Sequence, residues 1–296
     1  MSAHTTSGRI SILDLQQKKA ESRPITMMTA YDYPGATLVD EAGIDMILVG
    51  DSLAMTVLGY EDTVSITVDE MLHHCKAVAR GAKRAFLIGD MPFMSYNVDR
   101  SESIRNAGRF IKEGRMQAVK LEGGREMVET VRAIVEAGIP VMGHLGLTPQ
   151  TATKLGGLKV QAKTVDAAKR LIDDALALQE AGVFALVLEA IPAIIAEAVT
   201  KKVDVPTIGI GAGVNCDGQV LVFHDMLGLF DRFTPKFVKR YAELRRPILE
   251  ALSLYREEVE TRQFPTPAHS YALPKQVLEQ LNGHASDVVE SLTLAE

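Results

Sequence analysis

The chain has 296 residues, of which 47% are hydrophobic and 24% charged, and this length fits one α/β barrel as well as two ordinary domains. Its formal net charge is −6 and it has no basic block interleaved with aromatic residues, so we expect no nucleic-acid partner. The chain contains no Trp and 5% aromatic residues, which disfavours sites that stack on carbohydrate or single strands.

Apolar runs of strand length alternate with helical periods along the chain. A helical spacing over residues 10–21 predicts one helix that caps the barrel floor. Eight strands are expected at residues 25–32, 45–52, 85–92, 118–124, 140–147, 184–191, 205–213 and 219–225. Further helices are expected at residues 34–42, 68–80, 101–113, 125–137, 165–181, 192–201 and 236–261. This alternation predicts an α/β fold, a (β/α)8 TIM barrel with an N-terminal capping helix.

An open, doubly wound sheet is the alternative fold. No GxGxxG follows the first predicted strand, which removes the dinucleotide-binding version of that fold. Two connections, residues 53–67 and 148–164, are long, and we expect the first to cover a pocket because such loops are often functional. The expected domains are one catalytic barrel over residues 1–271 and a C-terminal tail, residues 272–296, that is partly disordered.

Four acidic residues end predicted strands. Asp51 follows MILVG, Asp90 ends LIGD, Glu122 ends VKLE and Glu189 ends LVLE. The carboxyl ends of barrel strands converge on the face where such barrels keep their active sites. The first three acids come from neighbouring strands, so their charges would crowd together, and Mg²⁺ is a cation suited to neutralise them. The alternative is that the acids only cap the loops and helices that follow.

Other polar residues lie at the same predicted rim. Lys120 is two residues before Glu122 and points the same way, so it could bind a substrate carboxylate or only pair with Glu122. Glu189 lies across the barrel, where it could act as a general base or cap the next helix. His144 could stabilise a developing oxyanion or be an ordinary polar residue of the rim. Ser52 offers its hydroxyl or backbone N–H to the same ligand.

The cysteines and the N-terminus bear on the cellular compartment. Cys75 and Cys216 lie far apart and outside any Cys/His ligand spacing, so we expect neither a disulfide framework nor a zinc site. The residues MSAHTTSGRI lack the pattern of a signal peptide, and no apolar run approaches about 18 residues. We therefore expect a cytoplasmic protein with no membrane partner.

Seven segments together resemble a known family. They are TAYDYP, LVGDSLAMTVLGY, GDMPFMSY, VKLEGG, PVMGHLGLTPQ, VLEAIP and IGIGAGVNCDGQVLVFHD. Their order and spacing over about residues 10–271 are similar to the ketopantoate (3-methyl-2-oxobutanoate) hydroxymethyltransferase family. The resemblance implies a TIM-barrel transferase of pantothenate biosynthesis that assembles as a homodecamer.

The resemblance also implies a reaction and its residues. A hydroxymethyl group would pass from 5,10-methylenetetrahydrofolate to 3-methyl-2-oxobutanoate, giving 2-dehydropantoate and tetrahydrofolate through a Mg²⁺-stabilised enolate. The metal site of the family corresponds to Asp51, Asp90 and Glu122. Its ketoacid contacts correspond to Asp51, Ser52, Asp90 and Lys120, and we expect His144 at the same substrate site. Glu189 matches the proton acceptor of the family.

Three other functions fit parts of the pattern. A Mg²⁺-dependent lyase of the isocitrate-lyase or phosphoenolpyruvate-mutase type would share the barrel and the enolate but would need no folate. A glycosidase would use two of the acids without a metal, although the missing Trp and the clustered carboxylates count against it. A barrel that only binds ligands would show neither turnover nor a metal requirement.

Overall fold

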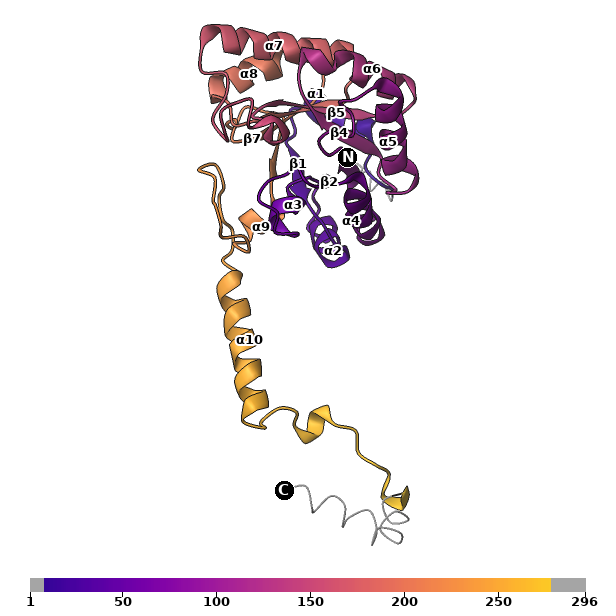
Figure 1. The fold of residues 1–296 in the computed structure, drawn as a ribbon, viewed down its shortest axis with the longest axis vertical. Coiled ribbons are helices and arrows are strands. Elements are labelled where there is room, and N and C mark those ends of the chain that lie inside the picture. The colour runs from indigo at the N-terminus through magenta and orange to yellow at the C-terminus, as the bar shows by residue number, and fades with distance from the viewer. Residues whose placement is uncertain (1–7, 278–296) are drawn as a thin grey trace, which may run out of the picture. The chain divides into compact units, whose positions relative to one another are not determined.

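Eight parallel strands close into a barrel in the computed structural model of the chain, which describes residues 8–277 (Figure 1). Neighbours in the sheet follow the order of the sequence, and β8 (Gly218–Leu221) pairs with β1 (Ile25–Thr29) to close it. The remaining strands are β2 (Met46–Val49), β3 (Phe86–Asp90), β4 (Ala118–Glu122), β5 (Val141–Gly146), β6 (Ala185–Glu189) and β7 (Thr207–Ile210). The predicted TIM barrel is confirmed, and the open sheet is wrong.

Helices follow the strands and cover the outside of the barrel. The longer ones are α2 (Tyr33–Glu41), α4 (Val68–Gly81), α5 (Arg100–Lys112), α6 (Val128–Glu136), α7 (Val165–Glu180) and α8 (Ala193–Lys202). Single turns are α3 (Leu53–Thr56), α9 (Phe223–Met226), η1 (Arg125–Met127) and η2 (Pro149–Thr151). Four of the longer helices begin at a side-chain cap that accepts a backbone N–H, and these caps are Asp32, Thr67, Asp99 and Thr164.

Most residues of the strands are buried on both faces of the sheet, which explains their nearly continuous apolar sequences, and the exposed Thr26 of β1 and Gln219 of β8 are polar. In β2, Met46 and Leu48 point into the barrel and join one buried cluster, whereas Ile47 and Val49 point outward and join a second cluster under the helices. Alternation of side chains along each strand therefore fills two layers of the core at once.

The N-terminal helix α1 (Ile12–Ala20) closes the amino-terminal end of the barrel, as predicted. Its Leu15 is buried in the inner cluster. Lys18 pairs with Asp45 at 2.5 Å and Lys19 pairs with Asp217 at 2.8 Å, and these acids precede β2 and β8. The amino ends of the strands are thus covered, and the carboxyl ends remain for a site.

Two helix starts differ from the prediction. Helix α5 begins at Arg100 instead of residue 101, because Asp99 is its cap and accepts the Glu102 N–H. The last helix, α10, begins at Arg245 instead of residue 236. Pro247 lies in the first turn of α10, where its missing N–H costs no helical hydrogen bond.

The chain divides into two compact units, residues 1–243 and 244–296, and the structure describes each in part. The second unit contains α10 (Arg245–Glu260) and η3 (Pro267–His269), and the Phe264 ring contacts both Tyr255 and His269. The domain boundary expected after residue 271 stays a prediction, and the tail expected at 272–296 lies outside the described residues from 278 onward. Within residues 8–277, no helix is long and apolar enough to span a membrane.

Replacing Phe110 of α5 by Ala should lower the free energy of unfolding by about 3–5 kcal/mol, because the ring is fully buried under the barrel. Leu13→Ala in α1 is the control. Its side chain is 75% exposed, so we expect a change within about 0.5 kcal/mol. Urea denaturation followed by circular dichroism measures both values, and equal losses in the two variants would contradict this account of the core.

Candidate active site

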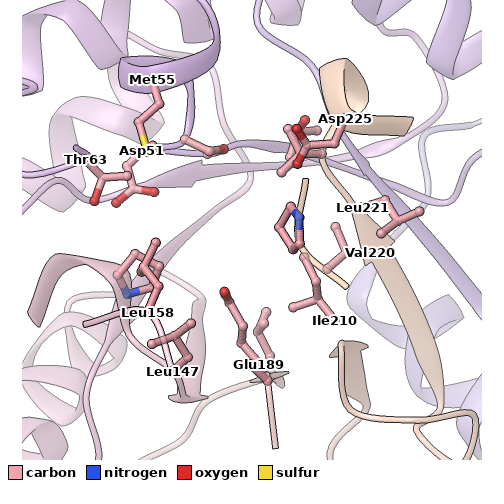
Figure 2. A pocket seen from close by; sticks show the side chains of 18 of the residues that line it. Asp51, Met55, Thr63, Leu147, Leu158, Glu189, Ile210, Val220, Leu221 and Asp225 are labelled. Carbon is pink, nitrogen blue, oxygen red and sulfur yellow. The ribbon is translucent and has the colours of Figure 1, made fainter. Parts of the chain in front are cut away.

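A cavity of about 350 Å³ opens at the carboxyl ends of the strands (Figure 2). Its lining includes every residue that the sequence analysis selected: Asp51, Ser52, Asp90, Lys120, Glu122, His144 and Glu189. The long connection 53–67 contributes Met55, Thr56 and Thr63 to the same wall, as predicted. The barrel therefore brings the selected side chains together, while their chemical roles stay predictions.

Lys120 lies among three carboxylates on one side of the cavity. Its Nζ is 2.8 Å from Asp90 Oδ1 and 3.9 Å from Glu122 Oε1, and the Asp51 N–H donates to Asp90 Oδ2 at 3.1 Å. All four residues are at most 6% exposed. Burial opposes the charge of Lys120, yet the nearby acids raise its pKa above the ordinary value. Lys120 therefore stays cationic.

The buried acids of this group hold their protons more readily than free acids do. Burial raises the pKa of Asp90 to about 7 against the opposing charge of Lys120, and the Asp51 charge adds to the rise. The pKa of Asp51 is also raised, first by burial and then by the Glu122 charge. Their negative charge is thus incompletely offset by Lys120, and a bound cation would relieve it.

His144 joins this group to Glu189. Its Nδ1 lies 3.2 Å from Glu122 Oε1, and its Nε2 lies 3.2 Å from Glu189 Oε2 in an ion-pair contact without hydrogen-bond alignment. Burial and the Lys120 charge lower the pKa of His144, but the two carboxylates outweigh them and raise it to about 9. The contacts with Glu122 and Glu189 thus favour the imidazolium form of His144 at neutral pH, against the Lys120 Nζ, which lies 3.3 Å from Nδ1.

Glu189 does not cap the next helix. Pro192 is the N-cap of α8 and no side chain accepts a hydrogen bond there, so the capping alternative for Glu189 is wrong. The carboxylate of Glu189 instead faces the cavity, where Figure 2 shows it beside Leu147 and Ile210. A carboxylate in this position can accept a proton from a bound ligand.

The backbone around Glu189 is closely fitted. Gly146 of β5 pairs with Glu189 and has φ +97°, and a Cβ at Gly146 would lie 2.2 Å from the Glu189 carbonyl oxygen. Ala190 follows with φ +47°, which is unusual for a residue with a side chain. Gly146 thus permits the close approach of β5 and β6 that points the Glu189 side chain into the cavity.

Two residues of this site escaped the sequence analysis. Gln150 donates from Nε2 to Asp51 Oδ2 at 3.0 Å and from its backbone N–H to Glu122 Oε2 at 3.1 Å. Tyr96 donates its hydroxyl to Gln150 Oε1 at 2.6 Å. Both residues come from loops that follow strands, in the segments HLGLTPQ and GDMPFMSY. The sequence pattern that could have indicated them is the polar residue at the end of each segment. Gln150 links two acids from different strands.

Ser52 lies on the β2 side of the cavity. Its hydroxyl oxygen is 2.8 Å from the Tyr31 hydroxyl, and burial raises the pKa of Tyr31 to about 12. Tyr31 is thus a neutral hydrogen-bonding partner that holds the Ser52 hydroxyl in place. The His74 Nδ1 lies 2.6 Å from the Tyr31 carbonyl oxygen, which helps to fix the tyrosine.

The acids present oxygen donors of the kind that Mg²⁺ prefers. No three His, Cys, Asp or Glu residues within 8–277 are grouped closely enough to hold a metal ion. Mg²⁺ usually takes one or two carboxylates and completes its shell with water or substrate oxygens, which suits Asp51 and Asp90. The oxygens of Glu122 already contact His144 and the Gln150 N–H, so its direct ligation stays a prediction.

In the metal-free protein, His144 should titrate with a pKa of about 9, and Glu189→Gln should lower that pKa because it removes a carboxylate 3.2 Å from Nε2. The folded value lies above the unfolded value of about 6.5, so His144 stabilises the fold below that pH. This contribution is lost as the pH rises through about 9.

Histidine NMR over pH 5 to 10 measures these values. His224 is the internal control, because burial lowers its pKa and Glu189→Gln should leave it unchanged. A wild-type His144 that titrates at or below about 6.5 would contradict the imidazolium assignment.

Comparison with known proteins gives one consistent family. The sequence profile of ketopantoate hydroxymethyltransferase matches residues 9–267. A protein of Syntrophobacter fumaroxidans called 3-methyl-2-oxobutanoate hydroxymethyltransferase is 58% identical over 275 residues, which cover 93% of this chain and 97% of that protein. A protein of the same name from Oleidesulfovibrio alaskensis is 56% identical, with coverage of 93% and 95%.

The solved structures match the fold alone. A phosphonopyruvate hydrolase aligns with a TM-score of 0.58 at 13% identity, covering 94% of this chain and 96% of the other. A phosphoenolpyruvate phosphomutase from Streptomyces platensis aligns with a TM-score of 0.57 at 14% identity, with coverage of 97% and 100%. Both likenesses support the barrel architecture.

Proposed function

The chain belongs to the ketopantoate hydroxymethyltransferase family, and from this premise we propose that it transfers a hydroxymethyl group to 3-methyl-2-oxobutanoate. The proposed donor is 5,10-methylenetetrahydrofolate, the products are 2-dehydropantoate and tetrahydrofolate, and the reaction serves pantothenate biosynthesis. The observation that supports this proposal most is the placement of Glu189. Its carboxylate faces a cavity in which Lys120, Asp51 and Asp90 can receive an α-ketoacid.

Asp51 and Asp90 would hold Mg²⁺, with Glu122 as the third member of the proposed site. Bound there, the ion would polarise the keto group of the substrate and stabilise the negative charge that develops on its oxygen. Gln150 keeps Asp51 in place through its 3.0 Å hydrogen bond, and Lys120 keeps Asp90 in place through the 2.8 Å ion pair. These supports reduce the side-chain reorganisation that binding requires.

The side chains of the cavity bind the substrate and transfer its proton. Lys120 and Ser52 bind the ketoacid, and Glu189 takes the proton from C3. His144 lies 3.2 Å from Glu189, so it orients that carboxylate. C3 of the resulting enolate then bonds to the methylene carbon of the donor. Both bonds from that carbon to the two donor nitrogens break, and water supplies the hydroxyl oxygen. One nitrogen takes the proton that water releases, and the other takes the proton that Glu189 returns.

Exchange of the C3 proton tests this proposal first. The ketoacid is incubated with the protein in D₂O, with and without Mg²⁺, and NMR follows the loss of the C3 proton before methylenetetrahydrofolate is added. The proposal requires Mg²⁺-dependent exchange and then donor-dependent 2-dehydropantoate. Exchange without product would indicate another electrophile, as in a lyase, and no exchange would overturn the proposal.

Glu189→Gln should lower kcat by roughly 10²- to 10⁴-fold, because the amide cannot accept the C3 proton. Binding of the ketoacid, measured by calorimetry, should be retained. Glu180→Gln, an exposed change at the end of α7, is the matched control and should leave kcat unchanged. Near-normal turnover in Glu189→Gln would remove the base from this position.

Asp90→Asn should weaken the binding of Mg²⁺ by at least about 10-fold, since it removes a charged oxygen donor from the proposed site. Asp173→Asn on the exposed face of α7 is the control and should bind Mg²⁺ like the wild type. Titration calorimetry with the metal alone gives both affinities. An unchanged affinity in Asp90→Asn would place the ion elsewhere.

The homodecamer implied by the resemblance and the cytoplasmic location expected from the cysteines and the N-terminus belong to the same proposal. Sedimentation equilibrium of the full chain measures the assembly state. A mass other than that of ten chains of 32.2 kDa would contradict the decamer. It would not affect the proposed reaction, which the exchange experiment tests separately.

A further inference from the structure

The cavity has a second region that the ketoacid does not require. Figure 2 shows Asp225 separated from Asp51 along one side of the cavity, with Val220 and Leu221 beside Asp225. Further apolar lining comes from later in the chain, at Val222, Phe230, Phe233 and Phe237. This region, formed by residues 220–237, therefore combines apolar side chains with one carboxylate.

Asp225 is electrostatically separate from the acids around Lys120. The shifts in pKa of Asp51 and Asp90 have no contribution from Asp225 among their main causes. Tyr31 is the group whose pKa the Asp225 charge raises, after larger effects of burial and hydrogen bonding. Figure 2 shows the Asp225 side chain apart from that of Asp51, so Asp225 lies in a different part of the cavity from the proposed metal site.

The backbone holds Asp225 firmly at the start of the β8 loop. The Phe223 N–H donates to Thr29 Oγ1 at 2.9 Å, and the Gly228 N–H donates to the Asp225 carbonyl oxygen at 3.2 Å. The ring of His224, between these residues, packs on Tyr31 with a centroid distance of 5.4 Å. These contacts fix the single helical turn α9 that carries the Asp225 carboxylate.

No hydrogen bond donor satisfies this carboxylate within residues 8–277, and it forms no ion pair there. Arg240 acts on Asp225 only at a distance, because its guanidinium binds Glu243 and Thr234. Burial raises the pKa of Asp225 to about 6, against the opposing charge of Arg240. The Asp225 carboxylate therefore has both oxygens available to accept N–H groups of a ligand in the cavity.

We propose that Asp225 binds the N–H edge of the pterin ring of the one-carbon donor. This inference rests on the proposed function. A reduced pterin carries a 2-amino group next to a ring N–H, and two parallel donors of this kind match the two oxygens of a carboxylate. The rest of the pterin is a nearly flat heterocycle, which suits the apolar side chains of residues 220–237. Asp225 is thereby a specificity residue for the donor, whereas Glu189 and Lys120 act on the ketoacid.

The test compares Asp225→Asn and Asp225→Ala with the wild type in three measurements. The Mg²⁺-dependent exchange of the ketoacid C3 proton, measured without donor, should stay within about two-fold, since that step needs nothing from Asp225. The KM for 5,10-methylenetetrahydrofolate should rise by roughly 10- to 100-fold, the range for losing a hydrogen bond to a charged group. Asp173→Asn is the control and should match the wild type in both.

The third measurement identifies the contact itself. Calorimetry compares the binding of tetrahydrofolate with that of its analogue in which a methyl group replaces the 2-amino group. The wild type should prefer tetrahydrofolate by at least about 10-fold, and the Asp225 variants should lose this preference. A structural defect in a variant would weaken both ligands equally and would leave the preference intact.

The outcomes separate this inference from the proposed function. A wild type that makes product with the donor but does not distinguish the two folates would overturn the Asp225 assignment alone. Variants with an unchanged donor KM, or with exchange reduced as strongly as donor use, would overturn it as well. A wild type that exchanges the C3 proton but makes no product with the donor would overturn the proposed function, and the inference with it.

Discussion

The ion pair between Lys120 and Asp90 is the interaction on which the rest of the site depends. Four carboxylates, Asp51, Asp90, Glu122 and Glu189, face one cavity with only Lys120 and His144 as cations within the group. Without Lys120, the first three would have to bind protons or separate, because buried like charges are costly. The lysine permits the acids to coexist, and the remaining negative charge explains why Asp51 and Asp90 have raised pKa values.

The fold could be predicted from the sequence because the spacing of apolar residues and the positions of the acids both indicate the same barrel. Short apolar runs alternate with amphipathic periods, and acids recur where strands end, so both the barrel and its functional face follow from local signals. Helix starts were less certain where two capping residues compete, as Asp99 and Ser101 do in the segment DRSES. The start of α10 was misplaced because the apolar spacing of residues 236–248 continues through a segment whose backbone is irregular.

Within the site, the charged residues were predictable and the neutral ones that position them were not. A carboxylate at the end of a predicted strand can be identified from the local sequence pattern. Gln150 has none, because it acts by bonding to Asp51, 99 residues earlier, and no local pattern encodes such a pairing. The conformation of Gly146 depends likewise on Glu189, a neighbour in the sheet but distant in sequence. Tertiary contacts of this kind need the folded barrel before they can be seen.

The arrangement of charge also suggests an order of events. The groups proposed to bind and deprotonate the ketoacid support one another through Gln150, His144 and Lys120, whereas residues 220–237 reach this group through Tyr31, which contacts both Ser52 and His224. Proton removal therefore needs no donor in the cavity, whereas formation of the carbon–carbon bond does. A carboxylate that binds the donor apart from the acid cluster would leave that cluster undisturbed during the first step. The separation of Asp225 from that cluster thus favours independent binding of the two substrates.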